Sequence, residues 1–202
     1  LVKALCQGLD THWEVDVLIF PPFVYLEQAS RLLKGSKIKL GAQDVSAEPS
    51  QGAFTGQIAA DMLVDIGCQY VLVGHSERRT LCGETSVQVA SKCVVAQSAG
   101  LIPVVCVGEN ALERSAGKTE AVIQAQLQPV LELGALSSPL LVAYEPVWAI
   151  GTGLSATPEE ANRVHAYIRE QVGESVAILY GGSVKANNAG ALLEQPLIQG
   201  CL

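Results

Sequence analysis

The chain has 202 residues, of which 49% are hydrophobic and 16% are charged, so it can bury a sizeable core and is too apolar to be disordered. Its formal net charge of -7 gives no electrostatic support for a nucleic-acid partner. No apolar stretch approaches the roughly 20 residues that span a bilayer, so we expect no membrane partner.

The cysteines and histidines do not form a metal-binding pattern. None of the six cysteines belongs to a Cys-x-x-Cys pair, and the three histidines are scattered along the chain. Several cysteines lie inside apolar runs, which indicates buried, reduced thiols. We therefore expect a cytoplasmic protein without a metal ion.

Short apolar runs alternate with segments of helical spacing along the whole chain. In chain order, the pattern predicts a strand at 15–20, a helix at 25–33, a strand at 38–42, a polar loop at 44–57, a helix at 59–66, a strand at 70–73, a helix at 85–99, a strand at 102–107, a helix at 111–133 with an interruption near Gly117, a strand at 140–143, a helix at 158–172, a strand at 177–180 and a short helix at 187–193.

Strands that are apolar on both faces and alternate with helices are typical of a parallel sheet covered by helices. The strands lie too close together for two domains, so we predict a single domain over residues 1–202. Periodicity alone does not choose between an open, doubly wound sheet and a closed barrel. No Gly-x-Gly-x-x-Gly follows the first strand, which argues against a dinucleotide site.

The stretch 141–160 has the layout of a lid over a carboxylate. Glu145 stands at the end of an apolar run, and a glycine-rich tip follows at 151–153. Thr157 and Glu160 then form a capping box that begins the next helix. Such a segment has stiff ends, an apolar inner surface and free backbone N–H groups that can bind an anion. The simpler interpretation is an ordinary strand, loop and helix with a surface glutamate.

The ten residues 144–153, Tyr-Glu-Pro-Val-Trp-Ala-Ile-Gly-Thr-Gly, resemble the catalytic strand end and lid of the triosephosphate isomerase family. Three further segments support the resemblance in family order: 73–79, Val-Gly-His-Ser-Glu-Arg-Arg; 106–109, Cys-Val-Gly-Glu; and 180–184, Tyr-Gly-Gly-Ser-Val. The resemblance covers nearly all of the chain. It implies an α/β fold, an incomplete (β/α)8 barrel with strands two to seven and a stub of strand eight.

The resemblance also implies the reaction, which interconverts dihydroxyacetone phosphate and glyceraldehyde 3-phosphate without a cofactor. Glu145 corresponds to the base that moves a proton between two carbons of the triose phosphate. His75 corresponds to the neutral imidazole that polarises the carbonyl, and Glu77 to a supporting carboxylate of the site. The simpler interpretation of Glu77 is an ion pair with Arg78 or Arg79, and both interpretations can hold together.

His75, Glu145 and Ser183 each follow a strand directly, and in a parallel barrel such positions share one face. A carboxylate and an imidazole on that face suggest proton transfer next to a carbonyl. A histidine outside any motif is more often structural than catalytic. The run Gly-His-Ser-Glu-Arg-Arg around His75 reverses that preference. We expect packing roles for His165 and for the thiol of Cys106, and an exposed His12.

For the substrate phosphate, the resemblance implies the backbone N–H groups of Gly151, Gly181, Gly182 and Ser183. A Gly-Gly-Ser turn is common, so this signal depends on its context. The implied lid comprises Pro146, Val147, Trp148, Ala149, Ile150, Gly151, Thr152, Gly153, Leu154, Ser155 and Ala156.

Two parts of the family's site have no counterpart in the sequence: a lysine and its neighbouring asparagine after strand one, and a glycine pair after strand eight. Residues 1–5 read as the middle of a helix and 199–202 as the start of a strand, so we expect a chain truncated at both ends. An alternative function follows, that of an impaired or inactive family member that is only a folded, oligomeric or phosphate-binding protein. Another phosphosugar barrel enzyme is a third option, against which the lid sequence argues.

The loop 44–57 resembles the segment that the family inserts into a partner subunit. Asp44 and Gln57 stand where the family more often has asparagine and glutamate. We therefore expect a homo-oligomer, a dimer with an altered interface, whose small-molecule partner is a phosphorylated triose.

Overall fold

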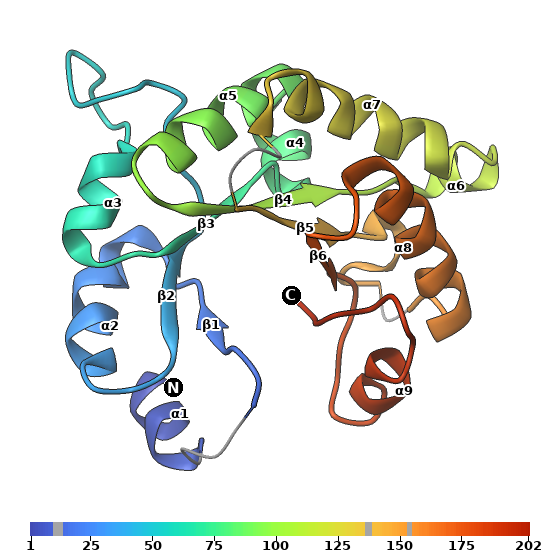
Figure 1. The fold of residues 1–202 in the computed structure, drawn as a ribbon, viewed down its shortest axis with the longest axis horizontal. Helices are drawn as coiled ribbons and strands as arrows, with labels where there is room; N and C mark the ends of the chain where they lie inside the picture. Colours follow the sequence, from blue (N-terminus) through green and yellow to red (C-terminus); the bar gives the residue numbers. More distant parts are fainter. Residues whose placement is uncertain (10–13, 136–138, 153–154) are drawn as a thin grey trace.

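Six parallel strands form one curled sheet in a computed structural model that describes residues 1–9, 14–135, 139–152 and 155–202 (Figure 1). The strands are β1 (Leu18–Ile19), β2 (Lys39–Ala42), β3 (Tyr70–Val73), β4 (Ile102–Val107), β5 (Leu141–Tyr144) and β6 (Ala177–Tyr180). Each strand pairs in parallel with the next one along the chain, so the order in the sheet is β1-β2-β3-β4-β5-β6. A parallel bridge between Tyr180 and Cys201 adds the predicted stub of a further strand.

Helices cover the outer side of the arc that the sheet makes in Figure 1. The α-helices are α1 (Val2–Gly8), α2 (Leu26–Leu33), α3 (Ala60–Ile66), α4 (Ser76–Cys82), α5 (Ser86–Ser98), α6 (Ala111–Ser115), α7 (Thr119–Glu132), α8 (Pro158–Val172) and α9 (Ala189–Leu193); η1 (Phe23–Tyr25) and η3 (Val147–Ala149) are short 3-10 helices. This arrangement is an incomplete (β/α)8 barrel, as the sequence predicts.

The two faces of the sheet belong to two apolar clusters, which explains why its central strands are apolar throughout. In β3, Val71 and Val73 pack in the large outer cluster with the helices. Tyr70 and Leu72 alternate with them and pack on the inner face with Cys106 of β4. Because both faces of these strands are covered, their sequences show continuous apolar runs instead of a polar alternation.

The first strand is shorter than predicted. Residues 15–20 are apolar enough for a strand, but only Leu18 and Ile19 pair with β2, and Val15 is 63% exposed. Among the described residues, β2 is the only strand that pairs with β1. A strand with one neighbour loses half of its possible ladder, so its ends do not form regular pairs.

Helix ends follow the expected local chemistry. Thr157 and Glu160 form a capping box at the start of α8, and Thr85 and Gln88 form one at the start of α5. Gly117, with φ at 67°, separates α6 from α7, where the sequence predicts an interruption. In the part of the chain that the structure describes, no helix has the length and apolar character of a membrane span.

Candidate active site

The ends of β3 and β5 bring His75 and Glu145 into contact. Nε2 of His75 lies 2.9 Å from Oε1 of Glu145, although 69 residues separate Glu145 from the adjacent Ser76. Only 2% of Glu145 is exposed, whereas 26% of the His75 side chain is accessible. A buried carboxylate and a partly accessible imidazole therefore meet at the C-terminal edge of the sheet, where active sites of such barrels lie.

The start of α4 orients both groups. His75 is the N-cap residue, and its Nδ1 accepts a hydrogen bond from the backbone N–H of Glu77 at 3.3 Å. The backbone N–H of Ser76 donates to Oε2 of Glu145 at 2.8 Å. With Nδ1 as an acceptor, the proton of a neutral ring is on Nε2, which faces the carboxylate; this tautomer follows from the hydrogen-bond network.

Two effects on the ionisation of His75 oppose each other. The hydrogen bond and charge of Glu145, with a smaller contribution from Glu77, raise the pKa of His75, and partial burial acts against them. The cap bond at Nδ1 is made only by a ring without a proton there. The Glu145 carboxylate thus favours the charged ring and the cap bond favours the neutral one, and a group with both kinds of partner suits proton exchange.

Arg79 joins the ends of β3 and β4 beneath the site. Its guanidinium donates to the carbonyl of Gly74 at 2.8 Å and to the carbonyl of Cys106 at 3.2 Å. A third bond, of 3.1 Å, reaches the hydroxyl of Ser86. Cys106 itself is fully buried, and burial raises the pKa of its thiol, which agrees with the expected packing role.

Glu77 lies at the rim of the site. Its carboxylate is 3.9 Å from Nδ1 of His75, and 73% of the side chain is exposed. Arg78 pairs with Asp44 at 3.1 Å, and Arg79 is engaged by backbone carbonyls. In the described residues neither arginine forms an ion pair with Glu77, and the nearest imidazole is that of His75.

Glu109 holds the first part of the predicted lid. Its Oε1 accepts hydrogen bonds from the hydroxyl of Tyr144 at 3.1 Å and from Nε1 of Trp148 at 3.0 Å. The guanidinium of Arg114 stacks 3.5 Å above the Trp148 ring and pairs with Glu160 at 3.0 Å. The lid is thereby connected to β5, to α6 and to the first turn of α8.

The second anchor of the lid comes from the end of β6. The N–H of Ala156 donates to the hydroxyl of Tyr180 at 3.3 Å, and the hydroxyl of Ser183 donates to the carbonyl of Ala149 at 3.0 Å. Gly151 has φ at 72°, a conformation that a glycine adopts without strain. Gly153 and Leu154 of the predicted lid lie outside the described residues.

One of the predicted phosphate glycines, Gly181, lies directly beside the carboxylate of Glu145. The N–H of Gly181 extends the β5–β6 ladder by donating to the carbonyl of Tyr144 at 2.7 Å, so it is not the phosphate donor that the resemblance implies. A Cβ at Gly181 would come within 3.0 Å of Cγ of Glu145, and one at Gly182 within 2.3 Å of the Tyr180 hydroxyl. Gly181 and Gly182 are therefore sites of close approach that a side chain would obstruct.

Several of the contacts that build the site are not among those predicted from the sequence. Ser76 and Glu109 follow strand ends within the quoted motifs, so their position was a usable signal. Arg79 and Tyr180 act through long side chains whose targets come from other strands, and local pattern does not reveal such contacts. His165 is buried in α8, as expected, and His12 lies outside the described residues.

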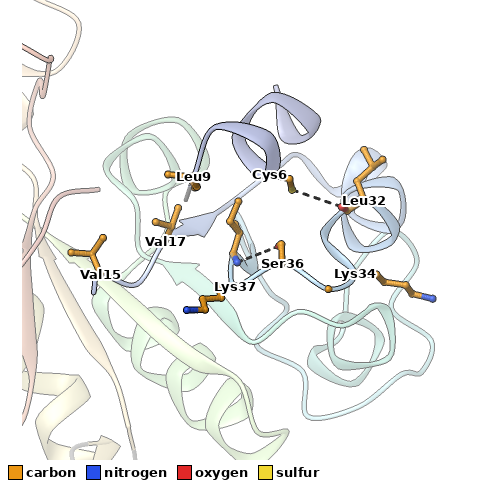
Figure 2. A pocket seen from close by; sticks show the side chains of 10 residues that line it. Cys6, Leu9, Val15, Val17, Leu32, Lys34, Ser36 and Lys37 are labelled. Carbon is orange, nitrogen blue, oxygen red and sulfur yellow. Dashed lines mark hydrogen bonds between the residues drawn. The ribbon is translucent and has the colours of Figure 1, made fainter. Parts of the chain in front are cut away.

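A separate hollow lies at the opposite end of the strands, between α1, α2 and β1 (Figure 2). Its lining is mostly apolar, with the Sγ of Cys6 directed at the carbonyl of Leu32 at 3.8 Å and with Lys34 and Lys37 at its border. This hollow offers no pairing of an imidazole with a carboxylate. Over the described residues, no group of three or more His, Cys, Asp or Glu side chains could hold a metal ion.

Comparisons with known proteins point to one family. A family model described as triosephosphate isomerase matches residues 1–202. Proteins named triosephosphate isomerase are similar to this chain: one from Nitrosococcus oceani is 49% identical over 100% of the chain and 84% of its own length. One from Paracidovorax citrulli is 52% identical over 100% of the chain and 84% of its own length. One from Cupriavidus taiwanensis is 55% identical over 98% of the chain and 85% of its own length.

Proposed function

The chain belongs to the triosephosphate isomerase family, and we propose that Glu145 and His75 carry out the proton transfers of its reaction. The function is that of the family, the interconversion of dihydroxyacetone phosphate and glyceraldehyde 3-phosphate. The observation that carries the residue assignment is the 2.9 Å contact between His75 and a carboxylate that is only 2% exposed. A paired imidazole and carboxylate supply the two proton-exchanging groups that this reaction needs.

Glu145 is proposed as the base. Its carboxylate takes a proton from C1 of dihydroxyacetone phosphate, which leaves an enediolate, and returns a proton to C2 to give the aldehyde. The Ser76 N–H donates to Oε2, so Oε1 is the oxygen that faces His75. In this proposal the substrate displaces the direct bond between His75 and Glu145 and lies against both groups.

His75 is proposed to act on the oxygens. With Nδ1 bound to the N–H of Glu77, the ring presents Nε2–H to the substrate. That N–H stabilises the negative charge that develops on the carbonyl oxygen, and the ring moves protons between the two oxygens of the enediolate. Glu77 lies 3.9 Å from Nδ1 and supports the ring from its other side.

The lid and the glycines are proposed to bind the phosphate. The N–H groups of Gly151, Gly182 and Ser183 are the donors, while Gly181 contributes the space that its missing side chain leaves. Ser183 also bonds to Ala149 of the lid, so that phosphate binding and lid position are linked through one residue. A closed lid excludes water from the enediolate.

We further propose a single-domain, cytoplasmic protein that forms a dimer through the loop 44–57. Support comes from exposed apolar side chains: Phe54 lies on that loop, and Leu81 lines a hollow together with Asp44. All six cysteines are free thiols, as in a reducing compartment. Light scattering at micromolar concentration should give the mass of a dimer; a monomer at high concentration would refute the assembly.

The function is tested by a coupled assay of protein freed from the isomerase of the expression host. We expect turnover of glyceraldehyde 3-phosphate by the chain and loss of that turnover in Glu145→Gln, which keeps the shape of the side chain and removes the base. Turnover that is equal in the two proteins would show that the assignment of Glu145 is wrong. Absence of turnover in both would favour a purely structural or phosphate-binding role.

A further inference from the structure

A glutamine on α7 holds the end of β4 by both of its amide atoms. Oε1 of Gln126 accepts a hydrogen bond from the backbone N–H of Gly108 at 2.7 Å, and Nε2 donates to the carbonyl of the same residue at 3.1 Å. These two hydrogen bonds resemble the backbone pairing between neighbouring strands, but a single side chain makes both of them. Both polar groups of the Gly108 backbone are thus fixed from the helix side.

Gly108 in turn lies against the backbone of Glu145. A Cβ on Gly108 would come within 1.7 Å of the carbonyl oxygen of Glu145 and within 3.2 Å of its Cα. The bonds on either side of this contact run from the N–H of Glu145 to the carbonyl of Val107, at 2.7 Å, and from the N–H of Val147 to the carbonyl of Glu109, at 3.1 Å. The position of Gly108 therefore sets the position of the Glu145 main chain.

We propose that Gln126 is a positioning residue for the catalytic carboxylate: it fixes Gly108, and Gly108 fixes the main chain from which Glu145 reaches His75. The inference rests on the proposed catalytic role of Glu145. Gln126 acts only through Gly108, because its two amide atoms are both used there. It lines the same small hollow as Glu145, Ser76 and Arg79, on the helix side of the site.

The physical reason is that proton transfer tolerates only small displacements of the reacting groups. Without the amide, the N–H and carbonyl of Gly108 lose their protein partner, and the residue can tilt toward water. A tilt there moves Glu145, and a displacement of about 1 Å of a reacting group costs on the order of 10²-fold in rate. The binding of substrate phosphate, which involves other residues, should be affected much less.

The first test measures the contact between Glu145 and His75 and does not depend on enzyme turnover. We would titrate the histidines by NMR in the wild-type chain and in Gln126→Met, which keeps the length of the side chain and removes both hydrogen bonds. If Glu145 shifts, its contact with His75 weakens, and the pKa of His75 should fall by about half a unit or more. His165, which does not contact Glu145, should keep its titration as an internal reference. Gln124→Met is the matched control, because Gln124 is an exposed glutamine on the same helix.

The second test separates positioning from binding. We expect kcat of Gln126→Met to fall about 10-fold to 100-fold, with KM within about threefold of the wild type. Gln124→Met should change neither constant. If Gln126→Met does not fold, Gln126→Asn replaces it; the shorter amide reaches at most one group of Gly108, so we expect the same changes at a smaller size.

The outcomes are distinct. An unchanged His75 pKa and kcat in a folded Gln126 variant would overturn the inference, and so would a loss confined to KM. A lower His75 pKa with a lower kcat would support it. If the wild-type chain shows no Glu145-dependent turnover, the proposed function fails, and the NMR titration still decides whether Gln126 positions Glu145.

Discussion

Two histidines lie on opposite sides of the end of β5, and their surroundings give them opposite properties. Consecutive residues of a strand point to opposite faces, so Tyr144 is directed at the helices and Glu145 at the site. The Tyr144 ring meets His165 of α8 edge-on, with 6.1 Å between ring centroids. On the other side, Oε1 of Glu145 lies 2.9 Å from Nε2 of His75.

The comparison shows that the dominant influence on an imidazole differs between the two positions: burial at His165 and the neighbouring carboxylate at His75. His165 is fully buried among apolar groups, and burial lowers its pKa to about 4, with a minor further contribution from Arg169 and an opposing one from the bond to Leu197. His75 is also partly buried, but the carboxylate beside it raises its pKa. One residue type is thus packed in the core on one face and paired with a carboxylate on the other.

The largest expected effect is on turnover. His75→Gln should lower kcat by about 10²–10³-fold, because the amide can still donate a hydrogen bond but cannot exchange a proton. Its melting temperature should fall by only a few degrees, because the amide of glutamine can still donate to Glu145 and only the cap bond at Nδ1 is lost. Steady-state kinetics and thermal unfolding of the same preparation check both parts. A large loss of stability in His75→Gln would remove the contrast with His165.

The reverse pattern is expected at His165. His165→Ala removes a fully buried ring and leaves the carbonyl of Leu197 without the bond of 3.0 Å that Nδ1 donates. We expect a loss of about 2–4 kcal/mol in the free energy of unfolding, which corresponds to a fall of roughly 5–15 °C in melting temperature. The kcat of the folded protein should be close to the wild-type value. A tenfold loss of kcat would show that His165 belongs to the site.

The two histidines should also give opposite contributions to the pH dependence of stability. The pKa of His165 falls from its ordinary 6.5 to about 4 on folding, so its neutral form favours the folded state above pH 6.5 and this stability is lost as the pH falls toward 4. His75 has a raised pKa, so its contribution is fully present below 6.5 and is lost as the pH rises through the folded value.

Urea unfolding at pH 7.5 and pH 5 measures this difference. Acidification across that interval should cost about 2 kcal/mol through His165, and this part should be absent in His165→Ala. The variant His75→Gln lacks the opposing contribution, so its stability should fall more steeply than that of the wild type. Parallel pH profiles for all three proteins would contradict the opposite pKa shifts.

The smallest effect concerns the helix that carries His165. Thr157→Ala removes the capping bond of 3.2 Å that the N–H of Glu160 donates to Oγ1 of Thr157 at the start of α8. We expect a loss of about 1 kcal/mol, visible as a shift of a few degrees in melting temperature. Thr157→Ser, which keeps the hydroxyl, is the control and should restore most of the difference.

Much of the fold could be predicted because its signals are local. Apolar runs placed β3, β4 and β6 at their observed bounds, and capping residues placed the start of α8. The predicted length of β1 was wrong, since pairing depends on how many neighbouring strands are present, which no local pattern reports.

For the site, the strand-end positions of His75 and Glu145 were visible in the sequence, whereas the supports from Arg79 and Gln126 were not.

The sequence by itself determined the alternation of strands and helices, the apolar faces and the family. These depend on spacing along the chain, where the chemistry of a few neighbouring residues decides the outcome. Only the tertiary structure decided which oxygen of Glu145 faces His75, which carbonyls Arg79 joins and which backbone Gln126 holds. Such contacts link residues far apart in sequence, and their distances are set by how the curled sheet and its helices pack together.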